Sequence, residues 1–557
     1  MPRAPRLVGV FALLLATSFG LAGAVPNGET GAPIPPTTPT VEGPTLTVEG
    51  PTLASLDPPA ADTARGVVFA DLNGNGVRDA GEPGIPGVLV SNQDQVVRTD
   101  GEGRFALPVE PGQVVYVHKP ADHDLPLSPA NSPHFSYVHE PEGSPALRYG
   151  GISPTGALPA SLDFALIPTE RALEFTVAVF GDPQPRDRRE LDFIRDDAVA
   201  EIASSGADFA MVLGDVMYDD LSLFPDYLGL TGAMGMPVWH VVGNHDLDFD
   251  AGANRHGRDT FRSVFGANRF SFEHGDVLFL VLDNVDYQGL GENERPRYRG
   301  YLGEDQLRWI GNVLAEVPED RLVVLAAHIP LWAWGGETEN VNTADRDRLL
   351  ELLGERPALV VTGHLHMTYH HWLERPRGEP VHHLVSATLS GTWWSGPEDH
   401  RGIPMTMQRD GNPNGFHLIT FRGTEYVERF QGLGLAPDHQ LRVEFPVGRI
   451  REAELEGEEL VVNVFSGGER HRVQLRVGDG PWVEMENFTG PSPAFEALLA
   501  RAPETFGANI RAIPTNHLWR IPIPEVLRQP GVHRIRIRAV DAHGRTHSGE
   551  SVVEVTP

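Results

Sequence analysis

Five short apolar runs between residues 172 and 432 each end in a glycine or alanine that is followed at once by a side chain able to bind metal. Parallel strands of an open α/β sheet bring the loops at their carboxyl ends to one edge, where ligands gather. The pattern therefore predicts an α/β domain whose loops converge on one site. The runs and the residues after them are 175–180 with Asp182 and Gln184, 209–213 with Asp215, 238–242 with Asn244, His245 and Asp246, 321–326 with His328, and 358–362 with His364 and His366.

Carboxylates, imidazoles and amide oxygens are the donors at these strand ends, and the chain has no cysteine that could add a thiolate. This donor set suits two divalent cations that share one carboxylate. Two cations about 3.5 to 4 Å apart can hold a bridging hydroxide as nucleophile and offset the charge on a phosphoryl group. An imidazole beside a carboxylate can protonate the leaving oxygen, and His245 with Asp246 supplies such a pair. The motifs therefore indicate hydrolysis of phosphate esters.

Each motif alone also has an ordinary interpretation. A Gly-Asp pair after a strand is more often a turn or a helix cap than a metal ligand. His364 and His366 are harder to explain in that way, because alternate residues of an extended segment project to the same side. The presence of all five motifs in one domain favours a metal site.

Length and charge narrow the function classes. The chain has 557 residues, a formal net charge of -31 and a single lysine, Lys119. Single hydrophobic cores stop growing at about 250 to 300 residues, so the length predicts several domains. A strongly acidic chain without a cluster of basic residues is repelled by phosphate polymers, so we expect no nucleic-acid binding.

Residues 1–24 have the features of a secretory signal peptide, with Arg3 and Arg6 before an apolar stretch and small residues at 22–24. That stretch is too short for a comfortable membrane span, and no other long apolar run follows it. We expect an exported mature chain, periplasmic or extracellular, without a transmembrane segment. Residues 25–64 are rich in proline and threonine, which predicts an extended spacer.

Two all-β domains are predicted on either side of the α/β domain. Residues 65–168 and 437–557 consist of short alternating runs separated by Gly, Pro, Asn and Asp, the pattern of small β-sandwiches. Between them, residues 172–432 alternate apolar strands with amphipathic helices, the pattern of a layered α/β domain. The chemistry is expected in this central domain.

The motif order resembles the calcineurin-like metallophosphoesterases, which carry Asp-x-His, Gly-Asp, Gly-Asn-His-Asp/Glu, a lone His and Gly-His-x-His. The resemblance implies a four-layer core of two packed mixed β-sheets flanked by helices. It also implies that Asp215 bridges the metals and that His245 is the general acid with Asp246 as its orienting partner. By the same resemblance, the first metal would be held by Asp182, Asp215 and His366, and the second by Asp215, Asn244, His328 and His364.

The resemblance extends to a bacterial subgroup with extra N-terminal and C-terminal β domains, and it covers about residues 65–557. Its carriers lie in all three domains and are 69–76 (Phe-Ala-Asp-Leu-Asn-Gly-Asn-Gly), 391–396 (Gly-Thr-Trp-Trp-Ser-Gly), 410–415 (Asp-Gly-Asn-Pro-Asn-Gly), 517–519 (His-Leu-Trp) and 531–533 (Gly-Val-His).

Two positions leave the identity of the metals open. Position 184 is Gln where most of the family has His, and an amide oxygen is a weaker and harder donor than imidazole, so Mn, Mg, Zn and Fe all remain candidates. Tyr218 follows Asp215 at the spacing of the iron-binding tyrosine of purple acid phosphatases. The alternative is a tyrosine that packs beside the site.

The loop from Trp393 to Asn414 follows the last metal motif, so Trp393, Trp394, Asp410 and Asn414 could line a substrate pocket. Adjacent aromatic residues can equally anchor a loop to the core.

A second metal site is expected in the N-terminal β domain. Residues 71–82 place oxygen donors at the positions of a twelve-residue calcium loop, but the loop follows a predicted strand rather than a helix. A calcium ion would there pin a β-turn, and the alternative is an ordinary Asn/Gly turn. The donors are Asp71, Asn73, Asn75, Asp79 and Glu82.

The sequence therefore predicts an exported binuclear phosphoesterase acting on a phosphorylated small molecule or an envelope polymer. One alternative is a surface or carbohydrate-binding protein whose phosphoesterase core has decayed. A second alternative is a phosphodiesterase rather than a phosphomonoesterase.

Overall fold

The computed structural model describes residues 62–252, 254–333 and 338–557. The predicted signal peptide and most of the predicted spacer lie outside these residues. The spacer was expected to extend to residue 64, but strand β1 (Asp62–Ala70) already begins at Asp62, because its first residues pair with β4. Among the described residues, no helix combines the length and the apolar composition needed to cross a membrane.

The central domain is built on two mixed β-sheets. In the first sheet β9, β10 and β11 are parallel and β20 and β21 run antiparallel. In the second sheet β13, β16, β17 and β19 are parallel, with antiparallel β12 and β18 at the edges. The first sheet has the order β11 (Val238–His240), β10 (Phe209–Val212), β9 (Glu174–Phe180), β20 (Gly415–Arg422), β21 (Glu425–Gly432). The second sheet has the order β12 (Phe270–His274), β13 (Val277–Val281), β16 (Leu322–Ala326), β17 (Ala358–Thr362), β19 (Val381–Val385), β18 (Tyr369–Leu373).

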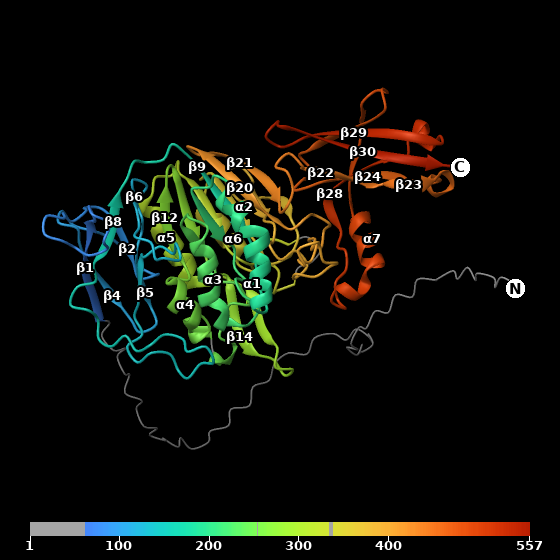
Figure 1. Ribbon diagram of the computed structural model, residues 1–557. Coiled ribbons are helices and arrows are strands. Elements are labelled where there is room, and N and C mark those ends of the chain that lie inside the picture. The colour runs from blue at the N-terminus through green and yellow to red at the C-terminus, as the bar shows by residue number, and fades with distance from the viewer. Residues whose placement is uncertain (1–61, 253, 334–337) are drawn as a thin grey trace, which may run out of the picture. The chain divides into compact units, whose positions relative to one another are not determined.

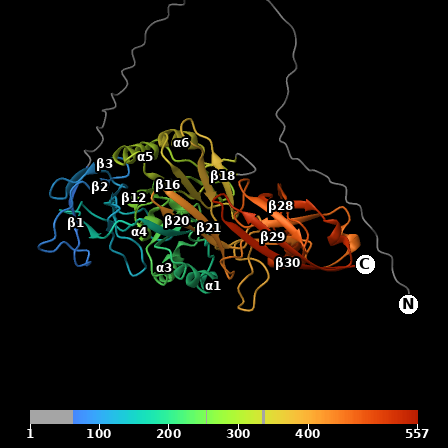
Figure 2. The ribbon, with the colours of Figure 1, turned by 90° about the horizontal axis from the view of Figure 1, so that it is seen from above.

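Helices cover the outer faces of both sheets. Along β9, Val177 and Val179 join the apolar core between the sheets, whereas Ala178 and Phe180 join a second core with α1, α3 and α4. Figures 1 and 2 show α5 and α6 on the opposite side of the sheets from α1, α3 and α4. This confirms the predicted four-layer α/β fold. The helices of the domain are α1 (Arg188–Ile194), α2 (Ala200–Ala203), α3 (Phe224–Gly232), α4 (Asp259–Phe265), α5 (Glu304–Glu316) and α6 (Arg346–Leu353), with a π-helical turn at Arg195–Val199 and 3-10 turns at Leu221–Leu223, Phe249–Ala251 and Asn254–His256.

The N-terminal domain consists of two small sheets, as expected. Its core continues into the core of the central domain: the ring of Phe135 lies 5.2 Å from that of Trp239 and 4.7 Å from that of Phe270. Trp309 of α5 donates a 3.1 Å hydrogen bond to the hydroxyl of Tyr116. The sheets have the orders β4 (Arg104–Val109), β1, β8 (Phe164–Pro168), β6 (His123–Asp124) and β3 (Val96–Arg98), β2 (Leu89–Ser91), β5 (Val114–Val117), β7 (Ser136–Val138).

The C-terminal domain is a β-sandwich with its own apolar core. Its predicted all-β character is wrong in one segment, because helix α7 (Pro493–Arg501) lies between β27 and β28. Ser492 caps this helix by accepting a hydrogen bond from the backbone of Phe495, and Pro493 suits the first helical turn. The sheets are β22 (Leu441–Phe445), β24 (Glu459–Val464), β28 (Thr515–Pro522), β27 (Glu486–Gly490) and β23 (Gly448–Arg451), β30 (Thr546–Thr556), β29 (Gly531–Val540), β25 (Arg472–Val477), β26 (Val483–Glu484), with 3-10 turns at Glu452–Leu455, Pro503–Thr505 and Glu525–Arg528.

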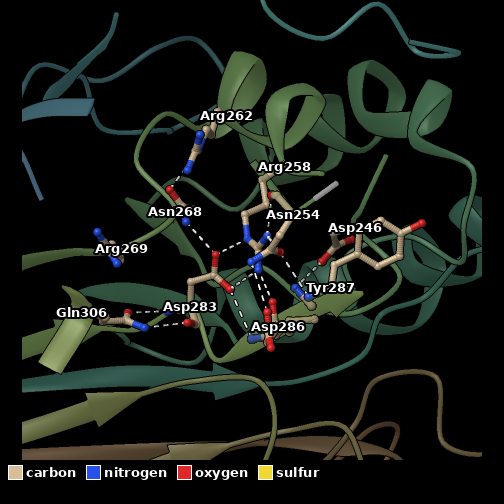
Figure 3. A network of polar contacts seen from close by, with 12 residues as sticks. Asp246, Asn254, Arg258, Arg262, Asn268, Arg269, Asp283, Asp286, Tyr287 and Gln306 are labelled. Carbon is tan, nitrogen blue, oxygen red and sulfur yellow. Dashed lines mark hydrogen bonds and ion pairs between the residues drawn. The ribbon is translucent and has the colours of Figure 1, made fainter. Parts of the chain in front are cut away.

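A buried ion pair holds the hairpin of β14 (Val285–Leu290) and β15 (Pro296–Gly300) to the central domain. Arg258 donates to both carboxylate oxygens of Asp283 and to the carbonyl of Val285 at the start of the hairpin. Asn268 donates a 2.6 Å hydrogen bond to the same carboxylate, and Arg258 also bonds the side chain of Asn254 at 2.6 Å (Figure 3). The network fixes where the hairpin leaves the sheet.

We expect Arg258→Met to destabilise the protein by about 3 to 5 kcal/mol, because it leaves the buried carboxylate of Asp283 without its counter-charge. Arg422→Met is the matched control, since its ion pair with Glu174 is exposed and is expected to contribute little to stability. Denaturant unfolding of both variants measures the difference. Equal losses of stability in the two variants would contradict the role assigned to Arg258.

Candidate metal centre

Asp215, after β10, lies where the predicted loops meet. Its Oδ1 is 3.2 Å from Nε2 of His328 and accepts a 2.9 Å hydrogen bond from the backbone of His245. Its Oδ2 accepts a 2.7 Å hydrogen bond from the amide of Gln184. One ligand atom each of Asp215, His328 and His364 lie within 4.8 Å of one another. This separation suits donors that share a cation.

The other predicted ligands surround this cluster. Oδ1 of Asn244 lies 3.0 Å from Nε2 of His328. Asp182 accepts a 2.9 Å hydrogen bond from the backbone of His364, and its Oδ1 lies 3.6 Å from Nε2 of His366. The structure therefore brings the predicted ligands of all five loops together, while their coordination of metal remains a prediction.

Gln184 provides a test of whether these residues fit a cation. Its Oε1 is buried and has no hydrogen-bond partner, although its amide nitrogen is bonded to Asp215. Buried polar atoms nearly always have a partner, so an unpaired oxygen beside carboxylates and imidazoles points to a positively charged ligand. The amide that replaces the family's usual His therefore fits the donor set.

The protonation states of two of the histidines suit metal binding. Burial lowers the pKa of His364 and of His366 to about 3, so both imidazoles are neutral and can offer a lone pair. Burial raises the pKa of Asp182 to about 7. Burial acts in the same direction on Asp215, but the neighbouring charge of His328 outweighs it and holds the pKa below its usual range.

The backbone is strained at the same residues. Positive φ angles, which non-glycine residues seldom adopt, occur at five of the predicted ligands: Asp182 (52°), Gln184 (38°), Asp215 (49°), His364 (75°) and His366 (52°). Such strain tends to collect at functional sites, where the surrounding structure maintains it. Here it turns side chains of neighbouring strands toward one point.

Asp246 does not pair with His245 as predicted. Its buried carboxylate accepts hydrogen bonds from the backbone of Val216, Met217 and Gly243, at 3.1, 3.0 and 2.9 Å. The carboxylate thus ties the loop after β10 to the loop after β11. The reason is local geometry, because the turn at 243–246 folds the Asp246 side chain back beneath the loops.

Asp219 is the partner that the sequence analysis missed. Its Oδ1 lies 2.5 Å from Nδ1 of His245, which leaves Nε2 of the imidazole free. Burial lowers the pKa of His245, but Asp215 and Asp219 more than compensate and raise it to about 9. The available signal was a second acidic residue four positions after Asp215 in the same loop.

Two aromatic rings pack on histidines of the site. Tyr218 stacks on His245 with 4.7 Å between ring centroids, the arrangement expected of a tyrosine that packs beside the site. Iron binding by Tyr218 remains a prediction. Trp393 stacks on His366 at 4.0 Å, and this contact places it at the edge of the metal cluster.

Three residues predicted to line a substrate pocket make hydrogen bonds that hold their loops in place. Trp394 is buried and donates a 2.8 Å hydrogen bond to the carbonyl of Pro183, so it anchors its loop. Asp410 is buried and accepts a 2.6 Å hydrogen bond from the backbone of Thr368. Asn414 bonds the carbonyl of Leu389 at 3.0 Å. Their polar groups hold loops together beneath the surface. Trp394 also lines a surface cavity with Arg186 and Glu190, and a role of these residues in a substrate pocket remains a prediction.

Tyr298 of β15 is a second residue that the sequence analysis missed. Its ring lies edge-on to His364, with 6.1 Å between ring centroids. The side chain of Asn340 hydrogen-bonds the Tyr298 hydroxyl, and the backbone carbonyl of Asn340 lies 2.9 Å from Nε2 of His364. The hairpin thus supplies a wall of the site, although no sequence motif marks it.

The predicted calcium loop forms a tight turn after β1. Asp71 accepts hydrogen bonds from the backbone of Gly74 and Gly76, both at 2.7 Å. Asp79 accepts 2.8 Å hydrogen bonds from the side chains of Asn73 and Asn75, and Glu82 bonds the backbone of Leu72 at 2.9 Å. The structure brings the five donors together in one turn, and calcium binding remains a prediction.

We expect Gly243→Ala to abolish metal binding, because a Cβ at Gly243 would lie 2.0 Å from the backbone nitrogen of Asp215. Gly229→Ala in α3 is the matched control, since no atom lies within 4 Å of the added Cβ and alanine favours the helix. Elemental analysis after dialysis against Mn²⁺ measures both. Full metal occupancy in Gly243→Ala would show that the close approach of the two loops is not required.

The chain is similar to several known proteins. A probable cyclic nucleotide phosphodiesterase of Rhodopseudomonas palustris is 26% identical over 221 residues, 38% of this chain and 67% of that protein. A dimetal phosphatase from Danio rerio aligns over 46% of this chain and 96% of its own, with 15% identity and a TM-score of 0.34. A purple acid phosphatase from yellow lupin (Lupinus luteus) aligns over 62% and 67%, with 12% identity and a TM-score of 0.34.

Three family models match successive parts of the chain. Residues 175–368 match the calcineurin-like phosphoesterase domain, residues 72–148 match the N terminal of calcineurin-like phosphoesterase, and residues 383–547 match its C terminal. The central match contains the loops that meet at Asp215. The chain therefore belongs to the calcineurin-like phosphoesterases with N-terminal and C-terminal extensions, and is a metal-dependent phosphoric ester hydrolase.

Proposed function

We propose that the protein is an exported binuclear phosphoesterase in which His245 protonates the leaving oxygen. The observation that carries the proposal is the convergence of six other predicted ligands around Asp215, with the backbone of His245 bonded to the same carboxylate. Two bound divalent cations would supply an activated water as nucleophile and offset charge on the phosphoryl group. Export is supported by the leader-like residues 1–24.

The residues of this chain supply proton transfer and orientation. Asp219 holds Nδ1 of His245, so the opposite ring nitrogen, Nε2, can carry the proton that is given to the leaving oxygen. The raised pKa of His245 keeps that proton on the ring at neutral pH. Tyr298 and Trp393, which contact His364 and His366, would form walls that position the ester.

A phosphodiester is the second candidate substrate. The relative from Rhodopseudomonas palustris is named a probable cyclic nucleotide phosphodiesterase. Whether the enzyme prefers a monoester or a diester depends on how the pocket accommodates the second ester group. A monoester and a diester of the same aryl alcohol therefore belong in one assay.

The activity test uses the purified chain with Mn²⁺, Mg²⁺ or Zn²⁺ and these two esters. We expect turnover of at least one ester, and His245→Ala should reduce kcat by about 10²- to 10⁴-fold without loss of bound metal. His123→Ala, in the N-terminal domain, is the control and should retain full activity. The absence of turnover on either ester with any of the metals would refute the proposal.

We expect Asp219→Asn to move the alkaline limb of the pH dependence of kcat/KM to lower pH by about one unit or more. Asp219 raises the pKa of His245, so without it the imidazole loses its proton at a lower pH and the acid form disappears earlier. A pH profile of the variant against wild type measures the shift. An unchanged limb with reduced kcat would assign Asp219 to structure rather than to the general acid.

A further inference from the structure

The outer face of the C-terminal sheet is rich in arginine. Along β29, Ile535 and Ile537 point into the sandwich core, and the alternating residues point outward. The chain as a whole has 45 basic and 76 acidic residues, but this face reverses that ratio. Its arginines include Arg449, Arg472, Arg476, Arg534, Arg536 and Arg538, and the acidic residues that contact these six are Asp479, Glu484, Glu550 and Glu554.

The arginines near the edges of this face each have a carboxylate of their own. Arg449 pairs with Glu554 at 2.8 Å, and Arg472 pairs with Glu484 at 2.7 Å. Arg534 pairs with Glu550. These contacts are ordinary cross-strand ion pairs, which need no further ligand.

The arginines in the middle of the face lack such partners. Arg476 of β25 lies directly opposite Arg536 of β29. Both reach the same oxygen of Asp479, at 3.5 and 3.3 Å, and the Asp479 side chain is 96% exposed. Glu550, which lies opposite Arg536 on β30, is bonded to Arg534. Like charges directly opposite each other destabilise a sheet, and one carboxylate in water offsets little of this cost.

Hydrogen-bonding capacity is also unused at this place. The Nε atoms of Arg476 and Arg536 are buried and have no partner among the residues that the structure describes, although Nη2 of Arg536 donates a 2.8 Å hydrogen bond to the carbonyl of Gly478. Arg538, two residues along β29, donates to Gln474 and lies 4.6 Å over the ring of Trp482. Its positive charge therefore has an aromatic face and an amide as neighbours, but no carboxylate bond.

We propose that Arg476, Arg536 and Arg538 form a binding site for a phosphate group, in which Asp479 occupies the place that the ligand takes. Guanidinium groups bind phosphate through paired, charge-assisted hydrogen bonds. A phosphate dianion carries more charge and more acceptor oxygens than the Asp479 carboxylate, so it can displace that carboxylate from both arginines. The site is separate from the metal centre and does not depend on the proposed activity.

The bound phosphate can be free inorganic phosphate or one group of a polyphosphate. Alternate outward residues of a strand lie about 7 Å apart, so Arg534, Arg536 and Arg538 form a row that could follow successive phosphates. A competition experiment between polyphosphate and inorganic phosphate distinguishes these two ligands. Polyphosphate that displaces inorganic phosphate at least about tenfold better per phosphate group indicates a chain ligand, and equal competition indicates free phosphate.

Equilibrium dialysis of the metal-loaded full chain against labelled inorganic phosphate tests the site. Phosphate bound at the metal centre is common to all variants, so the measured quantity is the additional binding. We expect the Arg476→Gln/Arg536→Gln double variant to lose one bound phosphate or to bind it at least about tenfold more weakly. The double variant Arg449→Gln/Arg472→Gln is the matched control, because it removes two arginines of the same face that have their own carboxylates and should bind as wild type does.

The direction in which Asp479→Asn changes the affinity for phosphate decides whether Asp479 competes with the ligand. If Asp479 competes with the ligand, this variant should bind phosphate a few-fold more tightly than wild type. If Asp479 merely bridges two arginines, the variant should lose thermal stability with no gain in phosphate binding. Unchanged binding in Asp479→Asn, or equal loss in the two arginine double variants, would overturn the proposal.

Discussion

The metal centre depends on one buried carboxylate that does not face it. Asp246 accepts three backbone hydrogen bonds from the loops after β10 and β11, and its side chain is fully buried. Because Asp215 precedes Val216, and Asn244 and His245 follow Gly243, this single group sets the spacing between the residues that would bridge the metals and those that would act on the ester. An unpaired buried N–H group costs about 1 to 3 kcal/mol, so the loops have little freedom to separate.

The strands that carry the site and the convergence of their loops could be predicted from the sequence. Strands of a parallel sheet are buried on both faces and therefore appear in the sequence as continuous apolar runs, as here before Gly-Asp, Gly-Asn-His and Gly-His-x-His. The polar residues that follow such strands meet beyond the carboxyl ends of the sheet. The role of the glycines follows from the same packing, since Gly243 has no room for a Cβ beside Asp215.

The partners of individual side chains could not be predicted in this way. Adjacency in sequence suggested that Asp246 orients His245, but turn geometry assigns that contact to Asp219. Trp394 and Asp410 were expected at a substrate pocket because they are aromatic and polar, but the sequence did not show that both are buried and anchor their loops. Tyr298 reaches the site on a hairpin whose path depends on the Arg258 and Asp283 pair, a contact between residues 25 positions apart.

The shared core of the N-terminal and central domains changes what a domain boundary means in this chain. Strand periodicity separates residues 65–168 from 172–432. Phe135 of the first segment nevertheless packs against Trp239 and Phe270 of the second, and the hydroxyl of Tyr116 accepts a hydrogen bond from the indole of Trp309. If the chain were divided between the two domains, each fragment would expose these aromatic rings to water. The N-terminal sheets therefore act as an outer layer of the catalytic domain, which can be exchanged in evolution only together with the surface that they cover.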